Sequence, residues 1–219
     1  MKKTAIGGLI FLACLMLQAG LTAQAPAKTI HYGNLDYTIV DDPSPSEPSN
    51  WVVQLDDKNN VQAVRQLTNI FRTDREYEFW QGSHIIAGYG SGMSDYGWGF
   101  DCRSDDNDGW GAIIRYQDAD NYYRFITVQD PGNGGPFRRL EKFVAGKRIV
   151  LDEKKEGFVL GQVYTIRIKA FGGQIDVYLD KDKILSAKDA SFSKGKFGIL
   201  TYANAPFSAW NLSHWTDNR

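Results

Sequence analysis

The residues best suited to bind an ion stand in one short run, positions 105–108 (Asp-Asp-Asn-Asp), directly before a glycine. Three carboxylates this close together repel one another unless water or a hard cation lies between them, and calcium prefers oxygen ligands. The spacing is not that of an EF-hand, because matching the glycine to that loop's invariant glycine puts Arg115 where a bidentate glutamate belongs. We predict a calcium site formed by Asp105, Asp106 and Asp108. A solvated turn without metal is the alternative.

A pair of arginines follows, on two strand-like segments joined by a polar turn. If the chain reverses at Asp118–Asn121, residues whose numbers sum to 239 lie opposite each other, so Arg115 faces Arg124. Like charges placed opposite on a sheet are destabilising, and arginine suits bidentate binding of carboxylates. We therefore predict that this face binds an anionic ligand, with an acidic glycan as the first candidate. The predicted ligand-binding residues are Arg115, Gln117, Tyr122 and Arg124. The alternative is an internal ion pair, for instance with Glu141.

Signatures of catalysis are weak. A retaining glycosidase needs two carboxylates about 5 Å apart, and the nearest sequence candidates, Asp101, Asp176 and Glu141, belong to no recognisable catalytic motif. No Gly-x-Ser-x-Gly nucleophile elbow occurs. We assign no catalytic residue, and we keep a polysaccharide lyase or glycoside hydrolase as an alternative function.

The elements that must position these residues are almost all strands. The chain alternates short segments rich in Val, Ile, Tyr, Phe and Trp with Gly, Asp, Asn or Pro, which is typical of a β-sandwich or barrel. Residues 166–170 and 175–179 alternate around a Gly-Gly turn and predict a hairpin. Val64, Leu67, Ile70 and Phe71 have helical spacing, which predicts a short helix over residues 63–71.

The amino-terminal residues predict export. Lys2 and Lys3 precede an uncharged apolar run from Thr4 to Leu21, and small residues follow, as in a bacterial secretory signal. We predict a signal peptide over residues 1–23, with cleavage between positions 23 and 27, and a periplasmic or extracellular protein. A transmembrane anchor is a weaker interpretation because the run contains three glycines and a glutamine. Lipidation at Cys14 is weaker still because its flanking residues fit poorly.

The remaining chain, residues 28–219, is predicted to be a single domain. Without the two lysines the chain has 25 − 2 = 23 basic residues against 26 acidic ones, a net charge of −3, which argues against nucleic acid or an anionic membrane as the main partner. It contains no second long apolar run, so we expect no membrane insertion. Cys102 is left without a partner for a disulfide, and its alternation with Phe100 places it in the core.

Several segments resemble one known superfamily. Residues 110–125, Trp-Gly-Ala-Ile-Ile-Arg-Tyr-Gln-Asp-Ala-Asp-Asn-Tyr-Tyr-Arg-Phe, are similar to the laminin-G and thrombospondin C-terminal-like branch of the concanavalin A-like lectins and glucanases. Residues 138–142, 164–168, 175–180 and 195–204 match further strands in order. The resemblance implies an antiparallel two-sheet jelly roll, and members often bind calcium at an acidic run before Gly-x-Gly. Because the superfamily includes lectins, adhesion modules and enzymes, the fold is the firmer inference.

Taken together, the residues and the resemblance predict an exported, non-catalytic carbohydrate-binding or adhesion-type β-sandwich. Calcium would hold the acidic turn, and acidic glycans would be the favoured ligands. A module that binds another envelope protein is a further alternative.

Overall fold

The computed structural model describes residues 27–32, 35–71 and 81–216. The predicted signal peptide, residues 1–23, lies outside these ranges. Within them, no helix has the length and apolar character needed to cross a bilayer.

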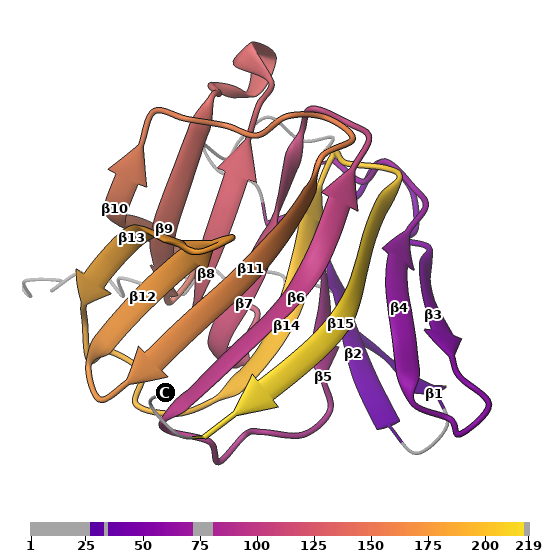
Figure 1. Cartoon of the computed structure of the whole chain (residues 1–219), viewed down its shortest axis with the longest axis horizontal. Coiled ribbons are helices and arrows are strands. Elements are labelled where there is room, and N and C mark those ends of the chain that lie inside the picture. The colour runs from indigo at the N-terminus through magenta and orange to yellow at the C-terminus, as the bar shows by residue number, and fades with distance from the viewer. Residues whose placement is uncertain (1–26, 33–34, 72–80, 217–219) are drawn as a thin grey trace, which may run out of the picture.

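The described chain folds into two antiparallel sheets (Figure 1), which confirms the predicted fold class. One sheet has eight strands in the order β1-β2-β5-β14-β7-β8-β9-β10, and the other has seven in the order β13-β12-β11-β6-β15-β4-β3. The strands are β1 (Ala27–Tyr32), β2 (Leu35–Asp41), β3 (Trp51–Leu55), β4 (Val61–Gln66), β5 (Ser83–Ala87), β6 (Tyr96–Ser104), β7 (Gly109–Asp118), β8 (Asn121–Val128), β9 (Phe137–Val144), β10 (Lys147–Lys154), β11 (Val163–Phe171), β12 (Gln174–Leu179), β13 (Asp182–Lys188), β14 (Lys196–Tyr202) and β15 (Phe207–Trp215). A 3₁₀ turn, η1 (Pro131–Asn133), precedes β9.

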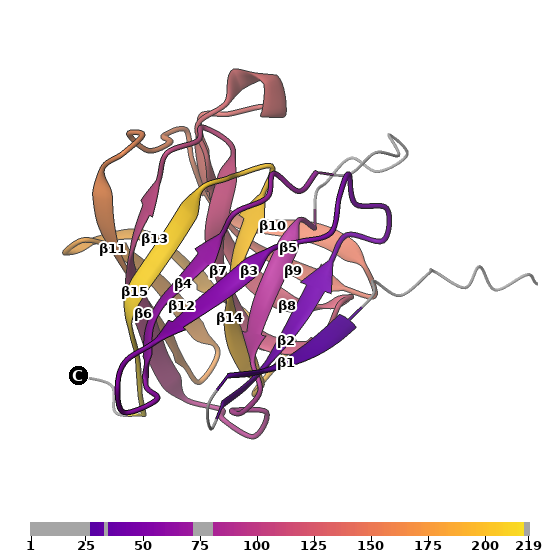
Figure 2. The ribbon, with the colours of Figure 1, turned by 90° about the vertical axis from the view of Figure 1, so that its right-hand side faces the viewer.

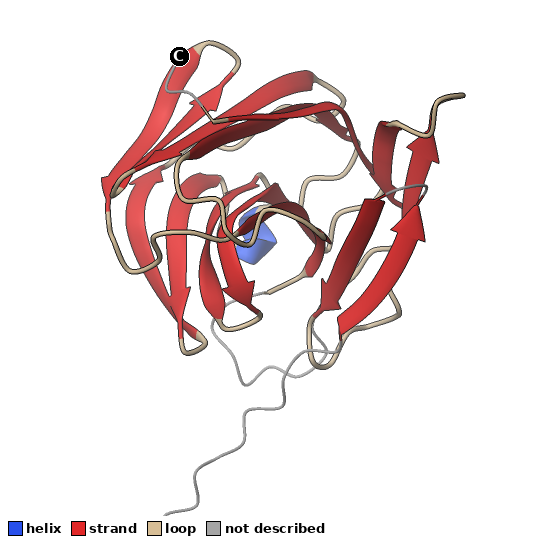
Figure 3. Ribbon diagram, turned by 90° about the horizontal axis from the view of Figure 1, so that it is seen from below, coloured by secondary structure: helices blue, strands red, loops and turns tan. Residues whose placement is uncertain are grey.

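The two sheets lie face to face, as Figure 3 shows from below. At one margin β10 contacts β13, where the amide of Ser186 donates to a carboxylate oxygen of Asp152 at 2.8 Å. At the other margin, which faces the viewer in Figure 2, β2 and β5 stand beside β3 and β4. The eight-stranded sheet therefore has an inner face, which packs against its partner sheet, and an outer face.

The main core fills the space between the sheets. Alternate residues of β6 point inward, among them Trp98, Phe100 and Cys102, all at most 2 % exposed. Trp110 on β7 contacts the rings of Phe125 and Phe207 from the same interior. The prediction that Cys102 is a small core residue is confirmed.

A bulge changes the predicted register of the β7–β8 hairpin. Asp118 pairs with Asn121, which confirms the predicted turn, but the register shifts between Ile114 and Asp118. Upstream of the bulge, Ile113 pairs with Arg124. The predicted pairing of Arg115 with Arg124 is therefore wrong.

The predicted helix over residues 63–71 is also wrong. Val61–Gln66 forms strand β4, which is paired on both sides, to β3 and to β15. Val64 is buried between the sheets, while Leu67 and Phe71 lie beyond the strand and are 44 % exposed. The four apolar residues that are spaced as on one face of a helix are thus not all buried.

Candidate functional site

Arg115 lies in the interior rather than on a binding face. Its backbone has φ 48°, in the left-handed region, and its side chain is fully buried. The guanidinium donates at 2.8–3.3 Å to the main-chain carbonyls of Ser94, Ala170, Gly172 and Phe192. Arg115 thus holds together three loops that are distant in sequence, instead of facing a ligand beside Arg124.

Gln117 is exposed and leans back onto its own chain. Its amide donates to the carbonyl of Arg115 at 3.0 Å and also contacts the carbonyl of Lys194. The structure therefore separates the four predicted ligand-binding residues into two pairs. Arg115 and Gln117 stabilise the bulge and the adjacent loops, whereas Tyr122 and Arg124 lie together on β8.

A buried ion-pair trio lies on the outer face of the eight-stranded sheet. Arg124 on β8 and Glu141 on β9 are register partners. Arg124 Nε donates to Glu141 Oε2 at 2.7 Å, and Arg148 Nη1 on β10 donates to Glu141 Oε1 at 3.2 Å. The side chains of Arg124 and Glu141 are at most 2 % exposed, and that of Arg148 is 25 % exposed. The alternative prediction, an internal ion pair with Glu141, is confirmed.

Aromatic rings surround this trio. Tyr122 stacks on Phe143 with centroids 4.6 Å apart and an interplanar angle of 11°, and the Arg124 guanidinium lies 4.7 Å from the same Phe143 ring. His84 on β5 meets Tyr122 edge-on at 5.4 Å. Sequence reasoning missed His84, because it stands alone in the sequence and meets β8 only through the pairing of β5 with β14 and of β14 with β7.

Two polar atoms in this group have no hydrogen-bond partner within the described part of the chain, namely Tyr122 Oη and His84 Nδ1. Both side chains are fully buried. His84 Nε2 lies 2.8 Å from the carbonyl of Gln81 and must donate to it, so Nδ1 carries a lone pair that awaits a donor. Buried polar groups are normally satisfied, so two such atoms on rings whose centroids lie 5.4 Å apart indicate a place for a ligand or water.

Burial keeps both rings neutral. Burial, together with the nearby Arg124 charge, lowers the pKa of His84 to about 3. Burial also raises the pKa of Tyr122 well above its usual value, although Arg124 opposes this rise. At neutral pH the imidazole is therefore an uncharged acceptor and the phenol an uncharged donor. We call Arg124, Glu141, Arg148, Tyr122 and His84 the outer-face cluster.

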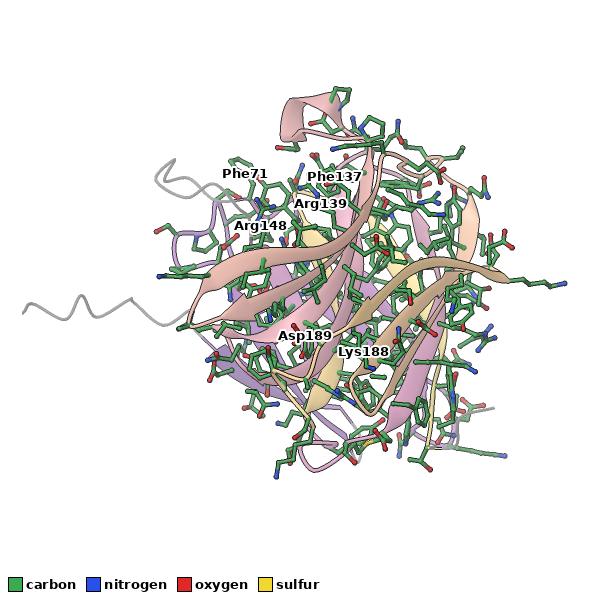
Figure 4. The ribbon with its side chains drawn as sticks, turned by 90° about the vertical axis from the view of Figure 1, so that its left-hand side faces the viewer. Phe71, Phe137, Arg139, Arg148, Lys188 and Asp189 are labelled. Carbon is green, nitrogen blue, oxygen red and sulfur yellow. The ribbon has the colours of Figure 1, made fainter. Side chains whose placement is uncertain are left out.

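Charged side chains at the β9–β10 edge connect the cluster to solvent. Arg139 lies over the Phe137 ring at 3.8 Å and pairs with Glu153. The side chains of Arg139 and Glu153 are 18 % and 25 % exposed. Figure 4 shows Phe137, Arg139 and Arg148 along this edge, with Phe71 on the same side of the molecule. The rim is thus rich in arginine; Phe71 is exposed on the same side, whereas Phe137 is buried beneath Arg139.

The three aspartates of the acidic turn have separate partners. Asp105 pairs with Arg103 at 2.7 Å, a carboxylate oxygen of Asp106 accepts from the amide of Ala205 at 3.3 Å, and Asp108 contacts the amide of Asn133. Within the described ranges, no three His, Cys, Asp or Glu side chains are grouped so that they could hold a metal ion. As they lie, these carboxylates do not form a calcium site. Calcium binding stays a prediction that requires them to turn toward one ion.

The raised pKa of Asp108 leads to a separate prediction about stability. Burial, together with the charges of Asp106 and Asp130, raises it from 3.8 to about 6. Since the folded-state pKa exceeds the unfolded one, ionised Asp108 destabilises the fold above pH 6, and this cost disappears as the pH falls toward 4. We expect Asp108→Asn to stabilise the protein at pH 7.5 by about 1 kcal/mol after screening, or about 2–4 °C in Tm, with no gain at pH 4.

Calcium should have a similar effect at pH 7.5 if it binds here. Thermal melts with and without added calcium would show a rise in Tm that Asp106→Ala abolishes. An unchanged Tm in both proteins would contradict the calcium prediction, while leaving the pH effect of Asp108→Asn intact.

The three carboxylates considered for catalysis do not come together. Asp101 and Asp176 lie on the seven-stranded sheet with β11 between their strands, and Glu141 lies on the other sheet. Asp101 accepts from Thr165 and Asn211, and Asp176 accepts from Ser186. This arrangement offers no carboxylate pair of the kind a glycosidase needs.

Comparison with known proteins shows the fold. No protein-family model and no curated relative matches the chain. Among solved structures, the chain is similar to the carbohydrate binding module CBM66 from Bacillus subtilis, with a TM-score of 0.58, 17 % identity, and coverage of 88 % of this chain and 96 % of that one. A Bacillus subtilis protein of unknown function with a galectin-like fold gives a TM-score of 0.53 at 9 % identity, covering 82 % and 89 %.

A functionally unknown protein from Saccharomyces cerevisiae gives a TM-score of 0.52 at 13 % identity, covering 78 % of this chain and 97 % of that one. At such identities the likeness concerns the fold alone. The resemblance to the laminin-G branch stays a prediction. The chain is an antiparallel two-sheet sandwich of the jelly-roll type.

Proposed function

We propose that this protein is an exported, non-catalytic carbohydrate-binding β-sandwich that binds its glycan at the outer-face cluster. The observation that carries the proposal is the pair of buried, unpartnered atoms, Tyr122 Oη and His84 Nδ1, beside an arginine-rich trio. Similarity in fold to a carbohydrate binding module supports it. Export rests on the amino-terminal sequence pattern.

The two unpartnered atoms have complementary requirements. His84 Nδ1 needs a donor and Tyr122 Oη can donate, so a ligand hydroxyl, which both donates and accepts, can satisfy both kinds of atom. Sugars present many hydroxyls, and their apolar ring faces pack against exposed aromatic side chains such as Phe71. Without such a ligand, both atoms are buried without a hydrogen bond, which lowers the stability of the fold.

The charge balance favours acidic glycans. Glu141 is a single carboxylate between Arg124 and Arg148, so the trio carries one net positive charge, and Arg148 reaches solvent. The neighbouring Glu153 is likewise shared by two cations, Arg139 and Lys155, so this group also carries one net positive charge. A uronate carboxylate could therefore bind at the rim through Arg148 while the sugar hydroxyls extend toward Tyr122 and His84. Arginine is well suited to this contact because its guanidinium binds a carboxylate through two parallel hydrogen bonds.

Binding should be measured by calorimetry with polyuronates and neutral glucans. We expect tighter binding of the polyuronates and a loss of about tenfold or more in Arg148→Ala, the size expected for one charge-assisted hydrogen bond. Arg167→Ala is the matched control, because Arg167 is exposed on the seven-stranded sheet. Equal losses in the two variants would contradict the assignment of the site.

Tyr122→Phe separates binding from stability. The substitution removes only Oη, which makes no hydrogen bond in the described structure, so the Tm should be unchanged or higher. Glycan affinity should nevertheless fall several-fold. A variant that melts as the wild type does and binds as tightly would show that the glycan does not reach this atom.

A further inference from the structure

A cavity of about 220 Å³ lies between the sheets, on the inner side of the strands whose outer side carries part of the outer-face cluster. Its walls come from β2, β4, β5, β6, β14 and β15 and are largely apolar. They include Val64, Ile85, Ala87, Trp98, Phe197 and Ile199. Protein interiors are normally packed without voids of this size, so the cavity is a feature to be explained.

A bulge in β15 shapes the mouth of the cavity. The register of β15 against β6 shifts between Trp210 and Ser213, where Asn211 has φ 53°. The shift turns His214 toward the cavity, and its ring stacks on Phe197 at 5.7 Å and 30°. Tyr89 meets the Phe197 ring edge-on at 5.5 Å. Three rings in mutual contact therefore frame the opening.

The polar groups lie at the mouth and the apolar groups lie inside. His214 is exposed and Tyr89 is 40 % exposed, whereas Trp98 and Ile199 are each 1 % exposed. No Asp, Glu, Lys or Arg is among the described residues that line the cavity. An apolar cavity of about 150 Å³ can stay dry and bind a benzene-sized molecule, so this larger one can hold a ring or two fused rings.

We propose that this cavity is a second binding site, for a small uncharged aromatic molecule whose polar group faces Tyr89 and His214. The ring would contact Trp98 and Phe197, whose own rings lie 5.0 Å apart and offer both edges and faces. A charged ligand is disfavoured, because the interior supplies no counter-charge. The site is independent of the proposed glycan site: Ile85 faces the cavity, whereas its neighbour His84 faces the outer-face cluster.

The test is calorimetric titration of the full-length protein with 2-naphthol, and with cyclohexanol as the aliphatic comparison. We expect saturable binding of 2-naphthol that is tighter than that of cyclohexanol. Ala87→Leu, which fills the cavity, should weaken it more than tenfold while keeping the Tm. His214→Ala should weaken it several-fold, and Tyr122→Phe, on the outer face, should leave it unchanged.

Binding that is equal in Ala87→Leu and in the wild type would overturn the proposal. So would an absence of binding up to the solubility limit of 2-naphthol, or stronger binding of cyclohexanol. If Ala87→Leu fails to fold, the decision falls on His214→Ala, and unchanged affinity in that variant overturns the proposal. The result of the glycan titrations neither supports nor contradicts the cavity site, because the two sites are independent.

Discussion

Replacing Arg115 by alanine is expected to lower the free energy of unfolding by about 3–5 kcal/mol, the range found when a large buried side chain is truncated to alanine. The side chain is fully buried, and four main-chain carbonyls depend on it. Without it these carbonyls lose a charged donor, the bond to Ala170 being fully buried, and a cavity the size of a long side chain opens in the interior.

Chemical denaturation at pH 7 would measure this loss. Arg115→Lys should fall between the wild type and the alanine variant, because an ammonium keeps the charge but cannot reproduce the planar fork that reaches four acceptors. Arg103→Ala is the surface control, since Arg103 forms an exposed pair with Asp105 and should contribute less than about 1 kcal/mol. A cost for Arg115→Ala no larger than that of Arg103→Ala would show that the buried contacts are not what stabilises these loops.

The local parts of the fold were predictable. The β11–β12 hairpin has the predicted turn, with Phe171 paired to Gln174 across two glycines and Ile166 paired to Leu179. Alternation of apolar and polar residues and a two-glycine turn are local signals, so they can be recognised without knowledge of the partner sheet. The predicted turn at residues 118–121 is correct for the same reason.

The bulge at residues 115–117 was not predictable from the same signals. Arg115 adopts a left-handed φ that arginine rarely takes, and no glycine or asparagine marks the position. The bulge exists because the guanidinium finds acceptors contributed by loops near residues 94, 171 and 192. These contacts come from parts of the chain that are distant in sequence. A register predicted from the hairpin's own residues is therefore wrong at the bulge, although it is correct at the turn.

The candidate site was only partly predictable, because some of its residues lie on consecutive strands and others come from distant parts of the sequence. Tyr122 and Arg124 were identified because they alternate on one strand, and Glu141 was named as a partner because it lies on the following strand. His84 reaches the cluster only because β5, far from β8 in the sequence, lies in the same sheet. The order of strands in a sheet cannot be derived from one segment of sequence. The cavity depends further on side chains contributed by strands of both sheets, a property that no single segment encodes.

Replacing Glu141 by alanine should have a second large effect, a loss of about 3–5 kcal/mol in the free energy of unfolding. Glu141 is fully buried, and its carboxylate is shared by Arg124 and Arg148. Alanine would leave the buried Arg124 without this counter-charge and next to a like charge. Glu141→Gln keeps the shape and one acceptor and should cost less, and Arg148→Ala should cost about 1 kcal/mol because Arg148 is partly exposed.

The double variant Arg124→Met/Glu141→Leu decides whether the pair serves stability or binding. Apolar residues of similar volume often replace a buried ion pair at little cost, so denaturation should show that the double variant recovers most of what Glu141→Ala loses. The glycan affinity should not recover, because the arginine and the carboxylate that orient Arg148 are both gone. A double variant as unstable as the sum of its single changes would make the pair a structural requirement of the sheet. A folded double variant that binds glycan normally would instead place the carbohydrate site elsewhere.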